Sequence, residues 1–190
     1  ARRDRRAPPG ARSPPGARGV LFAPWLAGER APFPDATLRG GIVHLALEHG
    51  PADVARAALE GVALNLRCVL DAMDARSDAG APDGADALPV AGGGAESDVW
   101  LQILADVLDR PLVRVAASRF AGAHGAALVA AVAAGAVPSV AALSGLVPRA
   151  RTFAPRPAHR AVYDAAVRSL RSLPGPLARS MALGLDRGRP

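Results

Sequence analysis

The sequence predicts an α/β fold with parallel strands, on three observations. Two short apolar runs, 88–91 and 111–116, are each followed by a segment with helical periodicity. The order strand, helix, strand, helix requires crossover connections and therefore favours a parallel sheet. The chain has 190 residues, of which 50% are hydrophobic, and this is enough for one domain with a buried core.

Residues 1–18 are rich in arginine, proline and glycine, and we call this segment the leader. The first 19 residues carry six arginines and one aspartate, a net charge of +5, which leaves +1 of the total +6 for the rest of the chain. Such a composition predicts disorder. Because the positive charge belongs to this tail, nucleic-acid binding is not expected as the main function. The chain does not begin with methionine, so we expect a fragment or a wrongly assigned start.

Two strands are predicted after the leader, at 20–26 and 42–47. The loop between them contains Pro32 and Pro34, which prevent a regular element. The domain that begins here is expected to span 19–175.

The segment 49–75 is the clearest helix, because Pro51 suits its first turn and apolar residues recur along it. The apolar stripe consists of Val54, Ala58, Val62, Leu66, Val69 and Met73. Arg56 and Glu60 are four residues apart on the other face. Gly61 costs about 1 kcal/mol relative to alanine in a helix, which indicates close packing at that point.

The second half of the chain alternates strands and helices. A linker precedes it, and a flexible tail over 176–190 is expected to follow it. Ser97 can cap a helix that ends near Leu108. The remaining predicted elements are strands at 88–91, 111–116 and 151–153 and helices at 123–134 and 158–173.

Cys68 is the only cysteine, which fits a reducing compartment and a small buried side chain. The weakly apolar span 121–147 is interrupted by Gly135 and Pro138, so we interpret it as two short helices rather than a membrane span. A cytoplasmic protein is expected. No metal site is predicted, because the histidines lack partners at ligand spacing.

Three glycines, Gly92, Gly93 and Gly94, stand between a predicted strand and a predicted helix. Glycines at such a turn let backbone approach a ligand, but this pattern matches neither the P-loop nor the dinucleotide fingerprint. Glu96 and Asp98 would each repel a phosphate by roughly 1 kcal/mol. A neutral ligand with hydroxyl groups, such as the adenine and ribose of a nucleotide, fits better, with Ser97 or a carboxylate contacting the hydroxyls. The alternative is a tight turn and a capped helix with no ligand.

Several motifs in order resemble the C-terminal domain of the FGGY carbohydrate kinases. They are "PWLAGERAP" (24–32), "RGGIVHLALEHGPADVARAALEG" (39–61), "GGGAESDVWLQILADVLDRPL" (92–112), "GAHGAALVAA" (122–131) and "FAPRPAHRAVYD" (153–164). One departure is His44, where many members have glycine. Within the family, these motifs resemble the xylulokinase-like branch in particular.

This resemblance implies an actin-like ATPase (ribonuclease H-like) fold, of which the chain would be the C-terminal domain, incomplete at its N-terminus. It implies transfer of the ATP γ-phosphoryl group to a sugar hydroxyl with Mg²⁺, the sugar being a pentulose such as D-xylulose. By position, Gly93, Gly94 and Ala95 would line adenosine, and Asp98 would provide a polar contact.

The family's catalytic aspartate lies upstream of the "PWLAGERAP" segment, so no catalytic residue is assigned in this chain. We therefore expect these residues to bind ATP, to need the missing N-terminal kinase domain as a partner, and to be inactive alone. A homodimer is a further expectation. The alternative is a non-catalytic remnant or interaction module of the same fold.

Overall fold

The computed structural model describes residues 8–76 and 87–181. The first seven residues, most of the expected linker (77–86) and the last nine residues lie outside this description. The helices are α1 (Pro51–Asp74), α2 (Asp98–Leu108), α3 (Ala121–Ala133), α4 (Arg160–Ser172) and α5 (Pro174–Met181). The strands are β1 (Leu21–Ala23), β2 (Gly41–Val43), β3 (Leu88–Val90), β4 (Leu112–Val115) and β5 (Arg149–Phe153).

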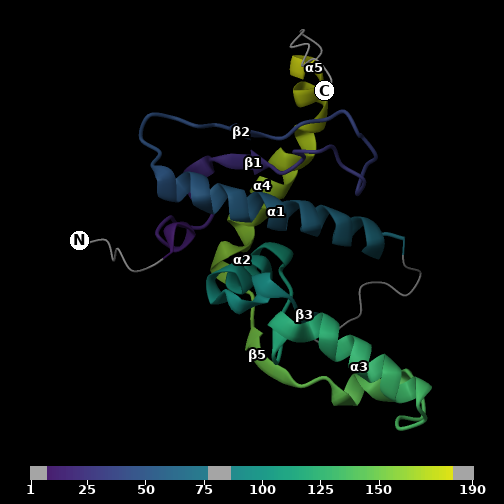
Figure 1. Cartoon of the computed structure of the whole chain (residues 1–190). Coiled ribbons are helices and arrows are strands. Elements are labelled where there is room, and N and C mark those ends of the chain that lie inside the picture. The colour runs from purple at the N-terminus through teal and green to yellow at the C-terminus, as the bar shows by residue number, and fades with distance from the viewer. Residues whose placement is uncertain (1–7, 77–86, 182–190) are drawn as a thin grey trace.

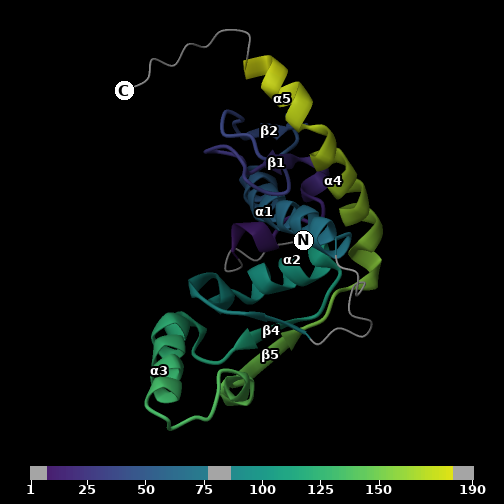
Figure 2. The same cartoon turned by 90° about the vertical axis from the view of Figure 1, so that its right-hand side faces the viewer.

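Helix α1 crosses the middle of the molecule (Figure 1). The antiparallel pair β1–β2 lies on one side of it and α2 on the other (Figures 1 and 2). Helix α4 runs along the flank of both, and α5 continues from α4 beyond β2 (Figure 2). The remaining strands form a second sheet in the order β3-β4-β5. Strands β3 and β4 pair in parallel, with α2 as their crossover, which confirms the α/β prediction. Strand β5 is antiparallel to β4 and lies at the edge, as expected.

The core joins β1, α1, α2 and α4 through large buried side chains, among them Trp25, Leu64, Leu101 and Tyr163. Helix α1 approaches β1 very closely at Gly61, where an added Cβ would lie 2.1 Å from the carbonyl oxygen of Phe22. This approach explains why a glycine stands in the middle of a helix.

The leader is ordered where it is described, which differs from the predicted disorder. Residues 8–18 form short 3₁₀ turns, η1 (Pro9–Ala11) and the start of η2 (Ala17–Gly19), and lie against α1. Ala17 is fully buried, and Ser13 Oγ donates to Asp53 Oδ1 over 2.7 Å. The prediction of disorder from composition was wrong for these residues because side chains far along the chain bind them. At the other end, α5 continues to Met181, so residues 176–181 are helical rather than a flexible tail.

The apolar stripe predicted for α1 does not face the core. Val62, Leu66 and Met73 are 40%, 43% and 61% exposed, whereas Arg56 and Glu60 on the other face are 5% and 3% exposed. Periodicity reveals that a helix has two faces but not which one the fold covers. The buried face carries the small and apolar residues Ala57, Gly61, Leu64 and Cys68. Arg56 and Glu60 lie within it because they pair with each other and with Tyr163.

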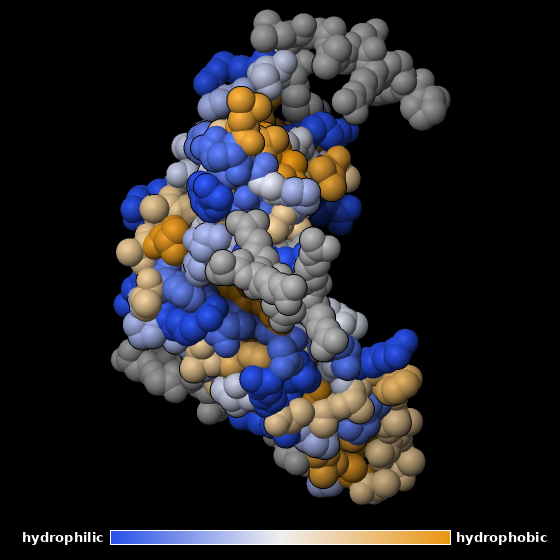
Figure 3. Space-filling model, turned by 90° about the vertical axis from the view of Figure 1, so that its left-hand side faces the viewer, coloured by the Kyte–Doolittle hydropathy of each residue, from blue (hydrophilic) through white to orange (hydrophobic). Residues whose placement is uncertain are grey.

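Helix α3 lies at the far end of the molecule, and none of its residues is buried (Figures 1 and 2). Its sequence is apolar apart from His124. Exposed Phe120 precedes it, and exposed Val140 and Leu146 follow it. Figure 3 shows apolar residues gathered at this end. No helix within the described part of the chain has the length and apolarity needed to cross a membrane.

Candidate functional site

The three glycines form an open turn between β3 and α2. Gly92 has a φ of 97°, which favours glycine, and its N–H donates to the carbonyl oxygen of Ser118 over 2.9 Å. Gly93 and Gly94 are exposed. An added Cβ at Gly93 would meet nothing within 4 Å, and one at Gly94 would lie 3.5 Å from Trp100 Nε1. The turn therefore presents bare backbone, with an indole behind it.

Two of the predicted site residues support the turn from within. Ala95 is buried, and its carbonyl oxygen accepts from Arg114 Nε over 2.6 Å. Ser97 Oγ accepts from Trp100 N over 3.2 Å and caps α2, as predicted. Ala95 thus lies beneath the surface that Gly93 and Gly94 expose.

Asp98 is held by two arginines that the sequence analysis did not identify. Its Oδ1 binds Arg114 of β4, and its Oδ2 binds Arg151 of β5. The hydrogen bond from Arg114 and the positive charges of Arg151 and Arg114 hold the pKa of Asp98 below its usual value. Both guanidinium groups also lie over the ring of Phe153. No sequence pattern links these residues, because they come from separate strands.

These contacts change the electrostatic argument made from the sequence. The charge of Asp98 is offset by two guanidinium groups, and Glu96 accepts a hydrogen bond from Ser118. The two acids therefore repel an anionic ligand less than their sequence positions suggest.

A hollow of about 310 Å³ lies beside Asp98, in the size range of small-molecule sites. Charged, amide and aromatic side chains meet there, including Arg151, Arg156, Gln102 and Phe153. Such a lining can contact both a flat ring and hydroxyl groups.

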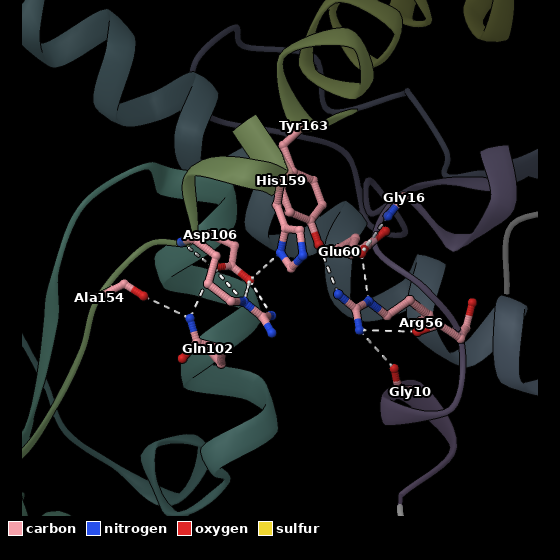
Figure 4. A network of polar contacts seen from close by, with 11 residues as sticks. Gly10, Gly16, Arg56, Glu60, Gln102, Asp106, Ala154, His159 and Tyr163 are labelled. Atoms are coloured by element: carbon pink, nitrogen blue, oxygen red, sulfur yellow. Dashed lines mark hydrogen bonds and ion pairs between the residues drawn. The ribbon is translucent and has the colours of Figure 1, made fainter. Parts of the chain in front are cut away.

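Asp106 is the centre of a hydrogen-bond network that includes Gln102 and Arg156, two residues that line this hollow (Figure 4). It is buried and accepts hydrogen bonds from Gln102, from His159 and from both the backbone and the guanidinium of Arg156. Burial raises the pKa of Asp106, but the hydrogen bonds from Arg156, His159 and Gln102 outweigh it and leave that pKa below its usual value. The network fixes the start of α4 against α2.

The loop that carries Glu29 is braced from inside. Glu29 Oε1 accepts from the backbone N–H of Arg30 and Ala31 at 2.7 and 3.2 Å, and Oε2 accepts from Asn65 at 2.7 Å. Asn65 in turn accepts from Trp25 Nε1. Glu29 is therefore used to shape its own loop.

The described residues contain no group of three His, Cys, Asp or Glu side chains that could hold a metal ion. With Asp98 and Glu96 already bound to other side chains, the residues present do not fit a Mg²⁺ site built from protein ligands alone. Cys68 is buried, and burial raises its pKa.

Comparisons with known proteins agree on one relationship. Residues 7–134 match the model of the C-terminal domain of the FGGY family of carbohydrate kinases. The chain is 38% identical over 105 residues to a xylulose kinase of Staphylococcus epidermidis, which covers 55% of this chain and 20% of that protein. It is 35% identical over 143 residues to a gluconokinase of Bacillus licheniformis, covering 73% and 26%. The structure superimposes on the ligand-bound xylulose kinase of Lactobacillus acidophilus with a TM-score of 0.78 and 27% identity, covering 92% and 34%.

Proposed function

Because the chain belongs to the FGGY family of carbohydrate kinases, we propose that it is the ATP-binding part of a kinase that phosphorylates a sugar hydroxyl. The fold is that of the C-terminal domain of these actin-like ATPases, as the sequence resemblance implied. The chain spans about a third of the solved relative and between a fifth and a third of the curated ones, so the activity of the whole enzyme is part of the proposal.

The observation that carries the proposal is the open glycine turn, which is followed four residues later by Asp98 in the lining of a hollow with polar and aromatic groups. Gly93 and Gly94 expose backbone where side chains would otherwise cover the surface, and the hollow reaches Asp98. We assign the nucleoside end of ATP to this surface, with Gly92 and Ala95 supporting it and Ser97 fixing the helix start. Arg151 would exchange its contact with Asp98 for one with the ligand.

ATP supplies the phosphoryl group when bound, and the transfer step needs a general base for the sugar hydroxyl. By resemblance to the family, the catalytic aspartate would lie upstream of the "PWLAGERAP" segment. We therefore propose that residues 1–190 position the nucleotide, and that a further kinase domain supplies the base, the sugar site and any protein contacts to Mg²⁺. The names of the matched relatives indicate different substrates. We therefore choose D-xylulose as the first pentulose to test and do not assign the sugar.

Calorimetric titration with ATP tests the assignment of the turn. We expect saturable binding that weakens at least tenfold in Gly93→Gln, because the new side chain covers the turn while meeting nothing in the fold. Gly175→Gln, at an exposed glycine in α5, is the matched control and should bind as the unmodified chain does. Equal affinity in all three proteins would contradict the assignment of the turn. Phosphorylation of D-xylulose by the chain alone would contradict the proposal that a further domain supplies the general base and the sugar site.

The second candidate is a non-catalytic interaction module of the same fold. The exposed apolar residues on α1 and α3 favour it, because such surfaces usually mark contacts with another protein. Absence of heat on titration with millimolar ATP would support this candidate against the first.

A further inference from the structure

A second hollow, of about 420 Å³, lies between the leader, β1, α1 and α4. It shares no residue with the hollow beside Asp98. Alanines line it from two helices, Ala57 of α1 and Ala165 and Ala166 of α4, and their small side chains leave the space open. The hollow opens to solvent, because Val162 and Ala165 of its lining are exposed, while Val20 and Leu64 at its inner side are buried. A hollow of this size therefore suits a ligand.

Glu60 gives this hollow a defined acceptor. Glu60 lines it and is almost fully buried. Its Oε1 accepts from Arg56 Nε at 2.6 Å, from the Tyr163 hydroxyl at 2.7 Å and from Gly16 N at 3.0 Å (Figure 4). Within residues 8–76 and 87–181, no donor binds Oε2.

The second carboxylate oxygen of Glu60, Oε2, faces the hollow. In the described part of the chain, no completely buried side-chain oxygen lacks a partner. Oε2 must therefore retain contact with open space, which for this residue is the hollow. A carboxylate can accept about four hydrogen bonds, so Oε2 has capacity for a ligand donor.

His44 adds an independent observation at the lining of the same hollow. It has a φ of 61°, a left-handed conformation that strains most residues but not glycine. Strained residues of this kind concentrate at active sites and ligand clamps. The chain thus places an imidazole beside the hollow at a position where the family motif often has glycine.

The surrounding charges decide the class of ligand. Arg56 already balances Glu60, and Arg18 adds a second guanidinium to the lining. Because the lining carries charges of both signs, an ammonium group or a carboxylate would each meet a like charge there, whereas a neutral hydroxyl can donate to Glu60 without that repulsion. We propose that the hollow is a second binding site, for a small and mostly apolar alcohol whose hydroxyl donates to Glu60 Oε2. The body of the ligand packs against Val20, Leu64 and Val162.

Three ring compounds of similar size separate the possibilities. The whole chain is titrated with cyclohexanol, protonated cyclohexylamine and cyclohexanecarboxylate, and binding is followed by the amide NMR signals of Gly16 and Ser169. We expect saturable shifts with cyclohexanol, at concentrations at least tenfold lower than for either charged compound. Tighter binding of a charged compound overturns the hydroxyl assignment, and absence of saturation by all three overturns the site.

Paired substitutions on α4 test the location. Ala165 and Ala161 are both exposed, but only Ala165 lines the hollow. Ala165→Leu should weaken cyclohexanol binding at least tenfold, and Ala161→Leu should leave it unchanged. Thermal unfolding of both variants confirms that they fold, and equal affinities would place the ligand elsewhere.

His44→Gly separates strain from binding. Glycine should relieve the backbone strain and raise the unfolding midpoint by about 2–4 °C. Loss of the imidazole should weaken cyclohexanol binding several-fold. A variant that is more stable and binds equally well would show that His44 takes no part in the site.

Discussion

The region built on α1 and α4 and the region that carries the glycine turn use their charged groups in opposite ways. The side chains of the Arg56–Glu60 pair are only 6% and 4% exposed, whereas those of the Arg151–Asp98 pair are 59% and 47% exposed. A buried pair that loses one partner leaves an uncompensated charge, but an exposed group can turn to water. The first region therefore uses the Arg56–Glu60 pair to hold the fold and leaves only Oε2 of Glu60 for a ligand, whereas the second keeps both members of its pair available.

Removing one guanidinium from each region should show the largest contrast. Arg56→Ala leaves Glu60 and Tyr163 buried without their cation, so we expect unfolding to become easier by about 3–5 kcal/mol. Arg151→Ala should leave the unfolding midpoint nearly unchanged. Urea denaturation followed by tryptophan fluorescence measures both. Similar losses in the two variants would remove the distinction between the regions.

In both regions, the sequence predicted some features and not others. The apolar runs and the cap at Ser97 were sufficient to predict the parallel β3–β4 pair and α2 with nearly correct bounds. Family motifs led to the fold class, because they carry the information of many sequences at once. All of these features are local in the chain, so a short window of residues contains their cause.

The remaining features depend on distant partners. Asp98 binds Arg114 and Arg151, which lie 16 and 53 residues away, and composition or spacing cannot reveal such pairs. The ordered leader has the same origin, since Ser13 meets Asp53 across 40 residues. The partly exposed stripe of α1 shows the same limit, because periodicity along a helix does not specify which face the fold buries.

Alanine substitutions at glycines compare how much room each region leaves for an added methyl group. Gly61→Ala forces a methyl group against the carbonyl oxygen of Phe22, and we expect a loss of about 1–3 kcal/mol in unfolding free energy. Gly93→Ala meets open space and should have little effect on stability. Thermal unfolding of both variants measures this difference. A stable Gly61→Ala variant would mean that α1 can move away from β1.

Acid sensitivity gives a smaller effect, and it separates Asp106 from Asp98. Both carboxyls have a lowered pKa in the folded chain, so each stabilises it above the ordinary aspartate pKa of about 4, and the stabilisation is lost as the pH falls through the folded value. Asp106→Asn should make the dependence of the unfolding midpoint on pH between about 5 and 2 shallower. The contribution of the exposed Asp98 to this pH dependence should disappear in 0.5 M salt, whereas the contribution of the buried Asp106 should persist. Equal salt sensitivity of the two asparagine variants would contradict the difference in burial.

The smallest effect on stability is expected on α3, where association should change instead. Val129 is exposed on a helix with no buried residue, so Val129→Glu should shift the unfolding free energy by less than about 0.5 kcal/mol. Val107 is fully buried in α2, and Val107→Glu should unfold the chain. If the homodimer expected from the sequence forms through the apolar end of the molecule, sedimentation should show it dissociating in Val129→Glu at unchanged stability. A dimer that withstands this substitution would have to use another surface, and the exposed stripe of α1, tested by Leu66→Glu, is the next apolar face that could form it.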